Sequence, residues 1–157
     1  MSMQVFAAMD RSLEKTEYFY KRILPDIADG DMFFNDKIIF DDKLTEQQAA
    51  TIGDIFKGYK VYAVDSCFNF SYNPTYKRQL SERYAINALD ELKWFKQFAK
   101  KKLQNGGVFM AVNLWLGREY PFKRVKTEQI DVDGWQLAED VAFEFSYGTV
   151  YKFSVTR

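Results

Sequence analysis

The sequence combines a large excess of aromatic residues with a complete absence of histidine. Its 157 residues include 15 Phe, 10 Tyr and 3 Trp, but no His. Because aromatic side chains bury large apolar areas, this content indicates an extensive aromatic core, a ligand cavity or a protein-binding face. The missing histidine excludes Ser-His-Asp and Cys-His mechanisms in their usual form, together with histidine-bearing zinc sites.

Cofactor chemistry is limited further by the cysteine and glycine content. A single cysteine, Cys67, excludes four-cysteine zinc sites and cysteine-ligated iron–sulfur clusters within one chain. The sequence contains no Gly-rich phosphate-binding loop of either standard type. We therefore expect no metal and no cofactor, and an enzyme of this composition would be restricted to carboxylate, lysine, tyrosine or Mg²⁺ chemistry.

Length and charge indicate one domain, spanning residues 1–157, without a field that attracts nucleic acid. The 22 basic and 22 acidic residues cancel to a formal net charge of zero, which argues against a general nucleic-acid binder. Residues 1–10 lack the basic start and long apolar stretch of a secretory signal, and the apolar runs are shorter than a membrane helix requires. We expect a cytoplasmic protein that does not enter a membrane.

Apolar spacing of three and four residues predicts three helices, the first of them over residues 12–27. The second is expected over residues 45–58, because Thr45 and Gln48 match a capping box and Gly58 suits the left-handed position after a helix.

The third and longest helix is expected over residues 81–104, before Asn105-Gly106-Gly107 stops it. Lys93, Lys96 and Lys100 share one of its faces, next to Trp94. Such a face could follow a phosphate backbone, but lysines near a helix C-terminus also complement the helix dipole and keep the surface soluble. We favour the second interpretation, and nucleic acid is not among the expected partners.

The other segments alternate apolar and polar residues with the period of a strand. A short hairpin of residues 32–34 and 37–40 and a strand over residues 60–72 precede the long helix. After that helix we expect a four-stranded antiparallel meander, in which Asp133-Gly134 forms a hairpin turn and residues 135–147 form one long strand.

This pattern predicts the α+β class, with two or three helices packed on a mostly antiparallel sheet and a C-terminal meander after the long helix. The order of elements is similar to that of the NTF2-like fold, in which early helices and a long third helix pack on a curved sheet around a pocket. The resemblance implies a cone-shaped alternative fold and carries no residue role with it.

Negative charge is concentrated in residues 26–54, which contain eight acidic and two basic residues and have a formal charge of −6. Three phenylalanines lie in the same segment, and aromatic anchors surrounded by charge are typical of interfaces. Solvated loop charge explains the pattern equally well. As a partner-binding face we predict Asp31, Phe33, Phe34, Asp36, Phe40, Asp41, Asp42 and Glu46.

Two carboxylates interrupt apolar rows and are the alternative catalytic candidates. Asp65 shares a strand face with Val61, Ala63 and Cys67, and Glu139 lies between Leu137 and Val141. If both entered a cavity, burial would favour their protonated forms and suit them to general acid–base work. The structural alternative is that Asp65 bonds to the backbone and Glu139 marks a bulge that faces solvent.

The interpretation that we favour is a non-catalytic binding protein whose acidic segment engages a protein partner with a basic surface. A concrete version is an immunity or inhibitor protein that neutralises a basic enzyme such as a nuclease toxin, since matched charge speeds association. The alternative is an NTF2-like small-molecule-binding protein or pocket enzyme that uses Asp65 and Glu139.

Overall fold

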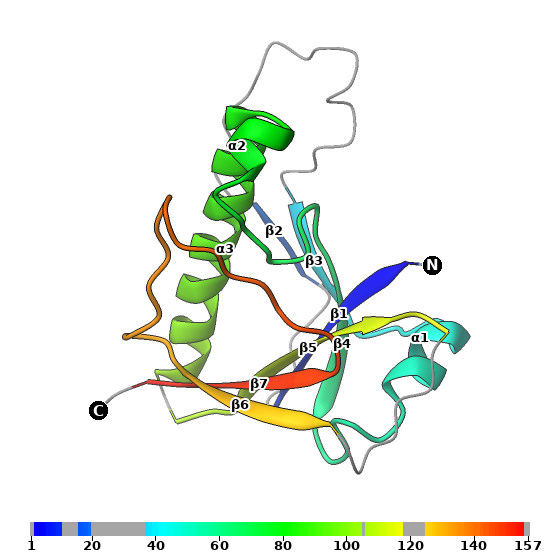
Figure 1. The fold of residues 1–157 in the computed structure, drawn as a ribbon. Helices are drawn as coiled ribbons and strands as arrows, with labels where there is room; N and C mark the ends of the chain where they lie inside the picture. The colour runs from blue at the N-terminus through cyan, green and yellow to red at the C-terminus, as the bar shows by residue number, and fades with distance from the viewer. Residues whose placement is uncertain (1, 11–15, 20–36, 105, 118–124, 156–157) are drawn as a thin grey trace.

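The computed structural model describes residues 2–10, 16–19, 37–104, 106–117 and 125–155, which form helices packed on one sheet (Figure 1). The α+β class, with helices on a mostly antiparallel sheet, is confirmed. The elements in chain order are β1 (Met3–Met9), β2 (Thr16–Phe19), β3 (Lys37–Asp41), α1 (Glu46–Ile52), β4 (Lys60–Asp65), α2 (Tyr76–Gln79), α3 (Glu82–Leu103), β5 (Phe109–Trp115), β6 (Lys126–Asp131) and β7 (Thr149–Ser154).

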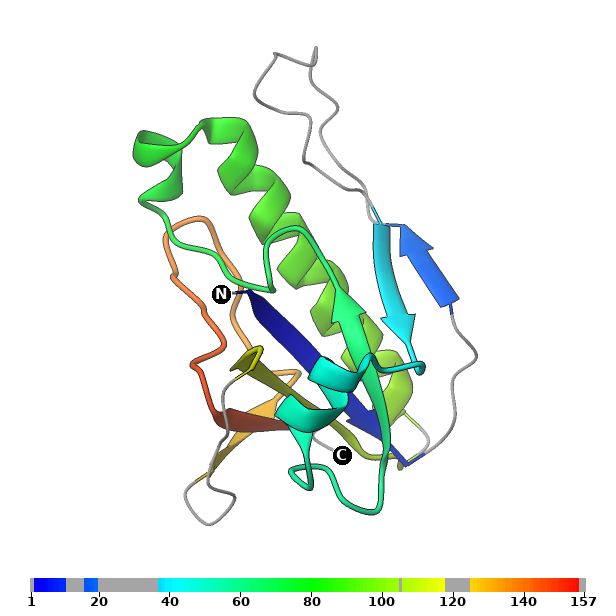
Figure 2. The ribbon, with the colours of Figure 1, turned by 90° about the vertical axis from the view of Figure 1, so that its right-hand side faces the viewer.

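The described strands form one seven-stranded sheet in the order β2-β3-β4-β1-β5-β7-β6. β1 lies at its centre and is buried on both faces. Val5 and Ala7 belong to the core under α3, whereas Phe6 and Ala8 belong to a second core that includes Ile52 of α1. Figure 2 shows α1 in front of the sheet and α3 behind it. β1 is absent from the predicted elements, because a short apolar run without alternation gives no strand period.

Two helices begin close to the predicted residues, since their caps are local signals. The Thr45 hydroxyl accepts a hydrogen bond from the Gln48 backbone N–H at 3.1 Å, and the Gln48 side chain accepts one from the Thr45 N–H at 2.9 Å. The Ser81 hydroxyl caps α3 by accepting a hydrogen bond from the Tyr84 backbone N–H at 2.9 Å. α1 ends earlier than predicted, at Ile52, because the chain changes direction at Gly53, whose φ is 47°.

The helix predicted over residues 12–27 is wrong where the structure describes it. Thr16–Phe19 form β2, which pairs with β3, so strand pairing outweighs the helical spacing of the apolar residues. The second arm of the predicted hairpin is present as β3, between β2 and β4. The first arm, at residues 32–34, lies outside the described residues.

The predicted meander differs from the structure after β5. β6 and β7 run parallel, so Asp133-Gly134 does not form a hairpin turn. Two neighbouring parallel strands need a connection that carries the chain from the end of the first strand back to the level where that strand began. Residues 135–148 form that connection outside the sheet, beside α3 (Figure 1), and not one long strand. The strand predicted over residues 60–72 is also shorter and ends at Asp65.

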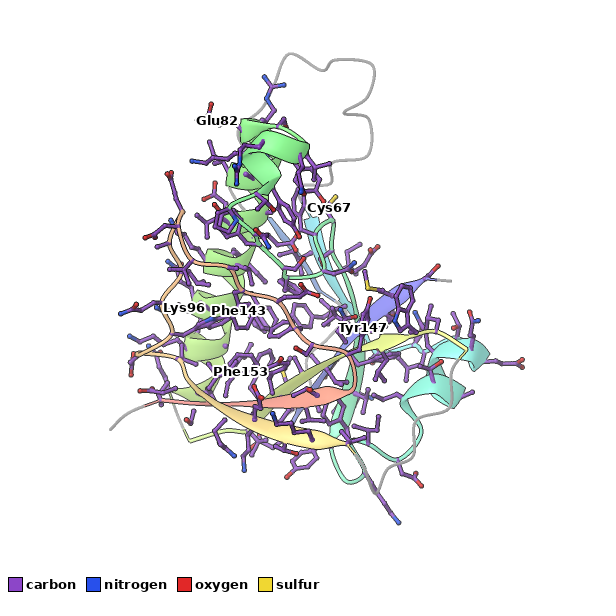
Figure 3. The ribbon with its side chains drawn as sticks, in the orientation of Figure 1. Cys67, Glu82, Lys96, Phe143, Tyr147 and Phe153 are labelled. Atoms are coloured by element: carbon purple, nitrogen blue, oxygen red, sulfur yellow. The ribbon has the colours of Figure 1, made fainter. Side chains whose placement is uncertain are left out.

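The connection of residues 135–148 is attached to the rest of the molecule by main-chain and side-chain hydrogen bonds. Tyr72 and Phe143 exchange two backbone hydrogen bonds of 2.7 and 2.8 Å. Lys96, labelled in Figure 3, extends from α3 and donates to the Trp135 carbonyl at 2.6 Å. Lys77 pairs with Glu139 at 3.1 Å. An irregular segment, with isolated bridges at Phe143 and Tyr147 in place of a continuous strand, therefore closes one side of the core.

The aromatic excess goes mainly into the core between α3 and the sheet. The ring of Phe95 lies 4.2 Å from that of Phe70, 5.6 Å from those of Phe109 and Phe145, and 5.7 Å from that of Phe153, between centroids. Figure 3 shows Phe143 and Phe153 on the side of the sheet that α3 covers. Such ring pairs add to the free energy of burial.

Phe95→Ala is expected to destabilise the protein by about 3–5 kcal/mol, because it removes a fully buried ring and leaves a cavity among other rings. Urea unfolding followed by fluorescence measures the loss. Phe95→Leu is the matched control and should lose clearly less. Equal and small losses for both variants would show that this ring does not organise the core.

Candidate functional site

Three residues of the predicted partner-binding face lie at the surface where β3 leads into α1. Asp41 and Asp42 are half-buried and Glu46 is exposed; we call these three residues the acidic face. The predicted face also includes Asp31, Phe33, Phe34 and Asp36, which lie outside the described residues.

Local hydrogen bonds fix the backbone of the acidic face. Asp41 ends β3, and its side chain accepts a hydrogen bond from the Lys43 backbone N–H at 2.9 Å. Glu46 occupies the first turn of α1, where the helix dipole favours a negative side chain. Asp42 pairs with Lys60 at 3.8 Å, and both side chains are partly exposed. This ion pair is loose and solvent-screened, so it weakens the negative field without removing it.

Phe40 does not belong to a surface for partners. Its side chain is fully buried and stacks on Phe98, with ring centroids 4.7 Å apart and an interplanar angle of 22°. The reason is strand alternation, because Ile38 and Phe40 both face the core under α3. Phe40 therefore anchors β3 to the core and is withdrawn from the predicted face.

The two alternative catalytic residues do not meet in a cavity. Asp65 is exposed at the end of β4, and Glu139 is exposed and paired with Lys77. Neither carboxylate lines the pocket found beside the turn after α1. The burial that general acid–base work would require is absent at both positions.

A different carboxylate, Glu91, is fully buried and was not among the predicted site residues. It lies on α3 and accepts hydrogen bonds from the backbone N–H groups of Phe70 at 3.1 Å and Phe68 at 3.4 Å. Asn69 and Phe70 adopt positive φ values of 48° and 52°, which are uncommon for residues other than glycine. The carboxylate thus holds a tight bend in the chain after β4.

A sequence signal for the burial of Glu91 does exist. Counting by three and four residues along α3 leads from Ala88 to Glu91 and on to Phe95, all within one buried stripe. Asp90, its neighbour, is half-buried and on the edge of the stripe. The helical spacing therefore distinguishes Glu91 from Asp90.

Burial raises the pKa of Glu91 to about 7, although hydrogen bonds from the Phe70 and Phe68 backbone N–H groups act in the opposite direction. Desolvation also raises the pKa of Tyr84, which lies on the same helix and packs edge-on against Phe68. Cys67 in the bend is half-buried. Glu91 is therefore a structural anchor whose carboxyl group changes its charge near neutral pH.

The raised pKa of Glu91 makes folding stability depend on pH. The ordinary pKa of a glutamate is 4.5, and the pKa of Glu91 in the folded protein is about 7. Between these two pH values, Glu91 has lost its proton in the unfolded chain but keeps it in the folded protein. The free energy of unfolding should therefore fall by about 3 kcal/mol as pH rises through this window, and Glu91 should add no further change above it. Urea unfolding of wild type and Glu91→Gln across pH 4.5–8 gives the free energy of unfolding of each protein. The difference between the two proteins should change with pH through this window.

Glu82→Gln serves as the matched control, since Glu82 is exposed in the first turn of the same helix. Its stability curve should run parallel to that of wild type. A Glu91→Gln curve that also runs parallel to wild type would contradict the assignment of a buried, titrating carboxylate.

Comparisons with known proteins identify no relative. No family model, no curated protein and no solved structure matches the chain. Within the described ranges, no helix has the length and apolar character needed to span a membrane. The same ranges contain no cluster of three or more His, Cys, Asp or Glu side chains that could hold a metal ion.

Proposed function

We propose that the protein is a non-catalytic binding protein whose acidic face engages a protein partner with a basic surface. The observation that carries the proposal is the position of Asp41, Asp42 and Glu46 at the surface, on a backbone fixed by β3 and the capped start of α1. A rigid charged surface loses little conformational entropy when a partner binds.

The distribution of aromatic residues also favours binding over catalysis. Rings that could have lined a large cavity are packed against one another under α3. The two carboxylates considered for acid–base chemistry are exposed and apart from the pocket. Binding at the protein surface is therefore better supported than a reaction in a pocket at Asp65 and Glu139.

The finer version of the proposal is an immunity or inhibitor protein that acts in the cytoplasm and neutralises a basic enzyme such as a nuclease toxin. An enzyme that binds nucleic acid carries a positive surface. A negative face steers association with such a surface and disfavours acidic competitors. The NTF2-like alternative fold stays a prediction, and no residue of the acidic face depends on it.

Neutralising the acidic face should reduce capture of the partner. In Asp42→Asn/Glu46→Gln the backbone and the size of both side chains are kept, while two negative charges are lost. We expect the partner captured by tagged wild-type protein from its native lysate to be strongly depleted with this variant, and association with the purified partner to slow by about tenfold at low salt. Mass spectrometry and stopped-flow kinetics measure the two effects.

Asp140→Asn/Glu144→Gln is the matched control, because it removes two exposed carboxylates from the connection beside α3. Capture by this variant should equal that of wild type. The proposal fails if both double variants retain the partner equally. It also fails if Asp42→Asn/Glu46→Gln still associates more slowly than wild type at high salt.

A further inference from the structure

An open pocket of about 300 Å³ lies beyond the last turn of α1, on the side of the sheet that carries α1. Figure 2 shows this side of the sheet toward the viewer. One wall is the turn that follows α1, and the floor belongs to the neighbouring strands β5, β7 and β6. Its volume is at the lower end of the range for small-molecule sites. The lining residues are Asp54, Ile55, Phe56, Tyr59, Met110, Val125, Thr127 and Val150.

The pocket walls are held in place by the fold. Val150 on β7 is the register partner of Thr127 on β6, and both line the pocket. In the turn after α1, Phe56 is buried against the sheet, and its carbonyl accepts the backbone N–H of Tyr59 at 3.1 Å. Because α1 ends after seven residues, it covers only part of this face and leaves a hollow beyond its last turn.

The chemical character of the pocket is an apolar floor with one charged group. Phe56, Met110 and Val150 are buried and apolar. Asp54 is exposed, and no ion pair joins its carboxylate to a cation of the described residues. Tyr59 is 40% exposed and provides an aromatic ring in the same lining. A carboxylate together with an aromatic ring favours a cation.

We propose that this pocket binds a small amphipathic amine, which we call the ligand. Its apolar body lies on Phe56, Met110 and Val150, and its ammonium group is held by Asp54 and the ring of Tyr59. The Thr127 hydroxyl supplies a further hydrogen-bonding group on the β6 side. Charge complementarity sets the class, because an anionic ligand of the same size would place like charge beside Asp54.

The amine pocket is distinct from the acidic face. It shares no residue with Asp41, Asp42 or Glu46, so its test gives an answer whether or not the proposed protein partner exists.

Phenethylamine is the probe, and phenylacetate is its matched anion of nearly the same size and shape. We expect phenethylamine to bind saturably in an NMR titration, with amide shifts concentrated at the lining residues. Phenylacetate should bind at least tenfold more weakly. Asp54→Asn should weaken phenethylamine binding about fivefold and leave phenylacetate unchanged or improved, since the residue is exposed and its ion pair is partly solvated.

Two further variants locate the site. Val150→Phe fills the floor of the pocket and should abolish phenethylamine binding. The melting temperature of this variant shows whether it folds. If it does not fold, Asp54→Asn and the comparison with phenylacetate test the proposal. Asp140→Asn removes an exposed carboxylate elsewhere and should leave phenethylamine binding unchanged. The proposal is overturned by an absence of saturable binding in the millimolar range, by equal affinity for phenylacetate, by unchanged affinity in Asp54→Asn, or by shifts centred elsewhere.

Discussion

The packing of α3 against the sheet through Phe95 is the interaction on which the rest of the structure depends. The ring of Phe95 contacts aromatic side chains from the bend after β4, from β5, from the connection of residues 135–148 and from β7. Two of these four segments have no regular strand pairing of their own. Aromatic contact area is therefore what holds them, together with the Tyr72–Phe143 hydrogen bonds and the Glu91 carboxylate.

This use of the aromatic residues separates core from function. Among the described residues, most buried aromatic side chains lie under α3, whereas the two binding sites proposed above lie on the other face and at the start of α1. That region carries the acidic face and the amine pocket, both at the ends of the short helix α1. Glu91 lies on α3, on the opposite side of the sheet from α1. Its protonation affects folding stability and the bend after β4, and not a binding surface.

Local signals explain which elements could be predicted from the sequence. The capping box at Thr45 and the apolar stripe of α3 depend only on neighbouring residues, and both helices are confirmed. β1 and the parallel pairing of β6 with β7 depend on contacts far apart in the sequence, so strand period alone could not reveal them. The site follows the same rule: the charges of Asp41, Asp42 and Glu46 were visible, whereas the burial of Phe40 and Glu91 needed the assembled core.

Native-state hydrogen exchange of the Tyr72 and Phe143 amides tests most directly whether the aromatic core unites these irregular segments with the sheet. Each amide donates to the carbonyl of the other residue, outside the seven-stranded sheet. If Phe95 binds both segments into one cooperative unit, their opening free energies should lie within about 1 kcal/mol of those of the central β1 amides. Exchange of both amides through a local opening several kcal/mol below that of β1 would contradict the account.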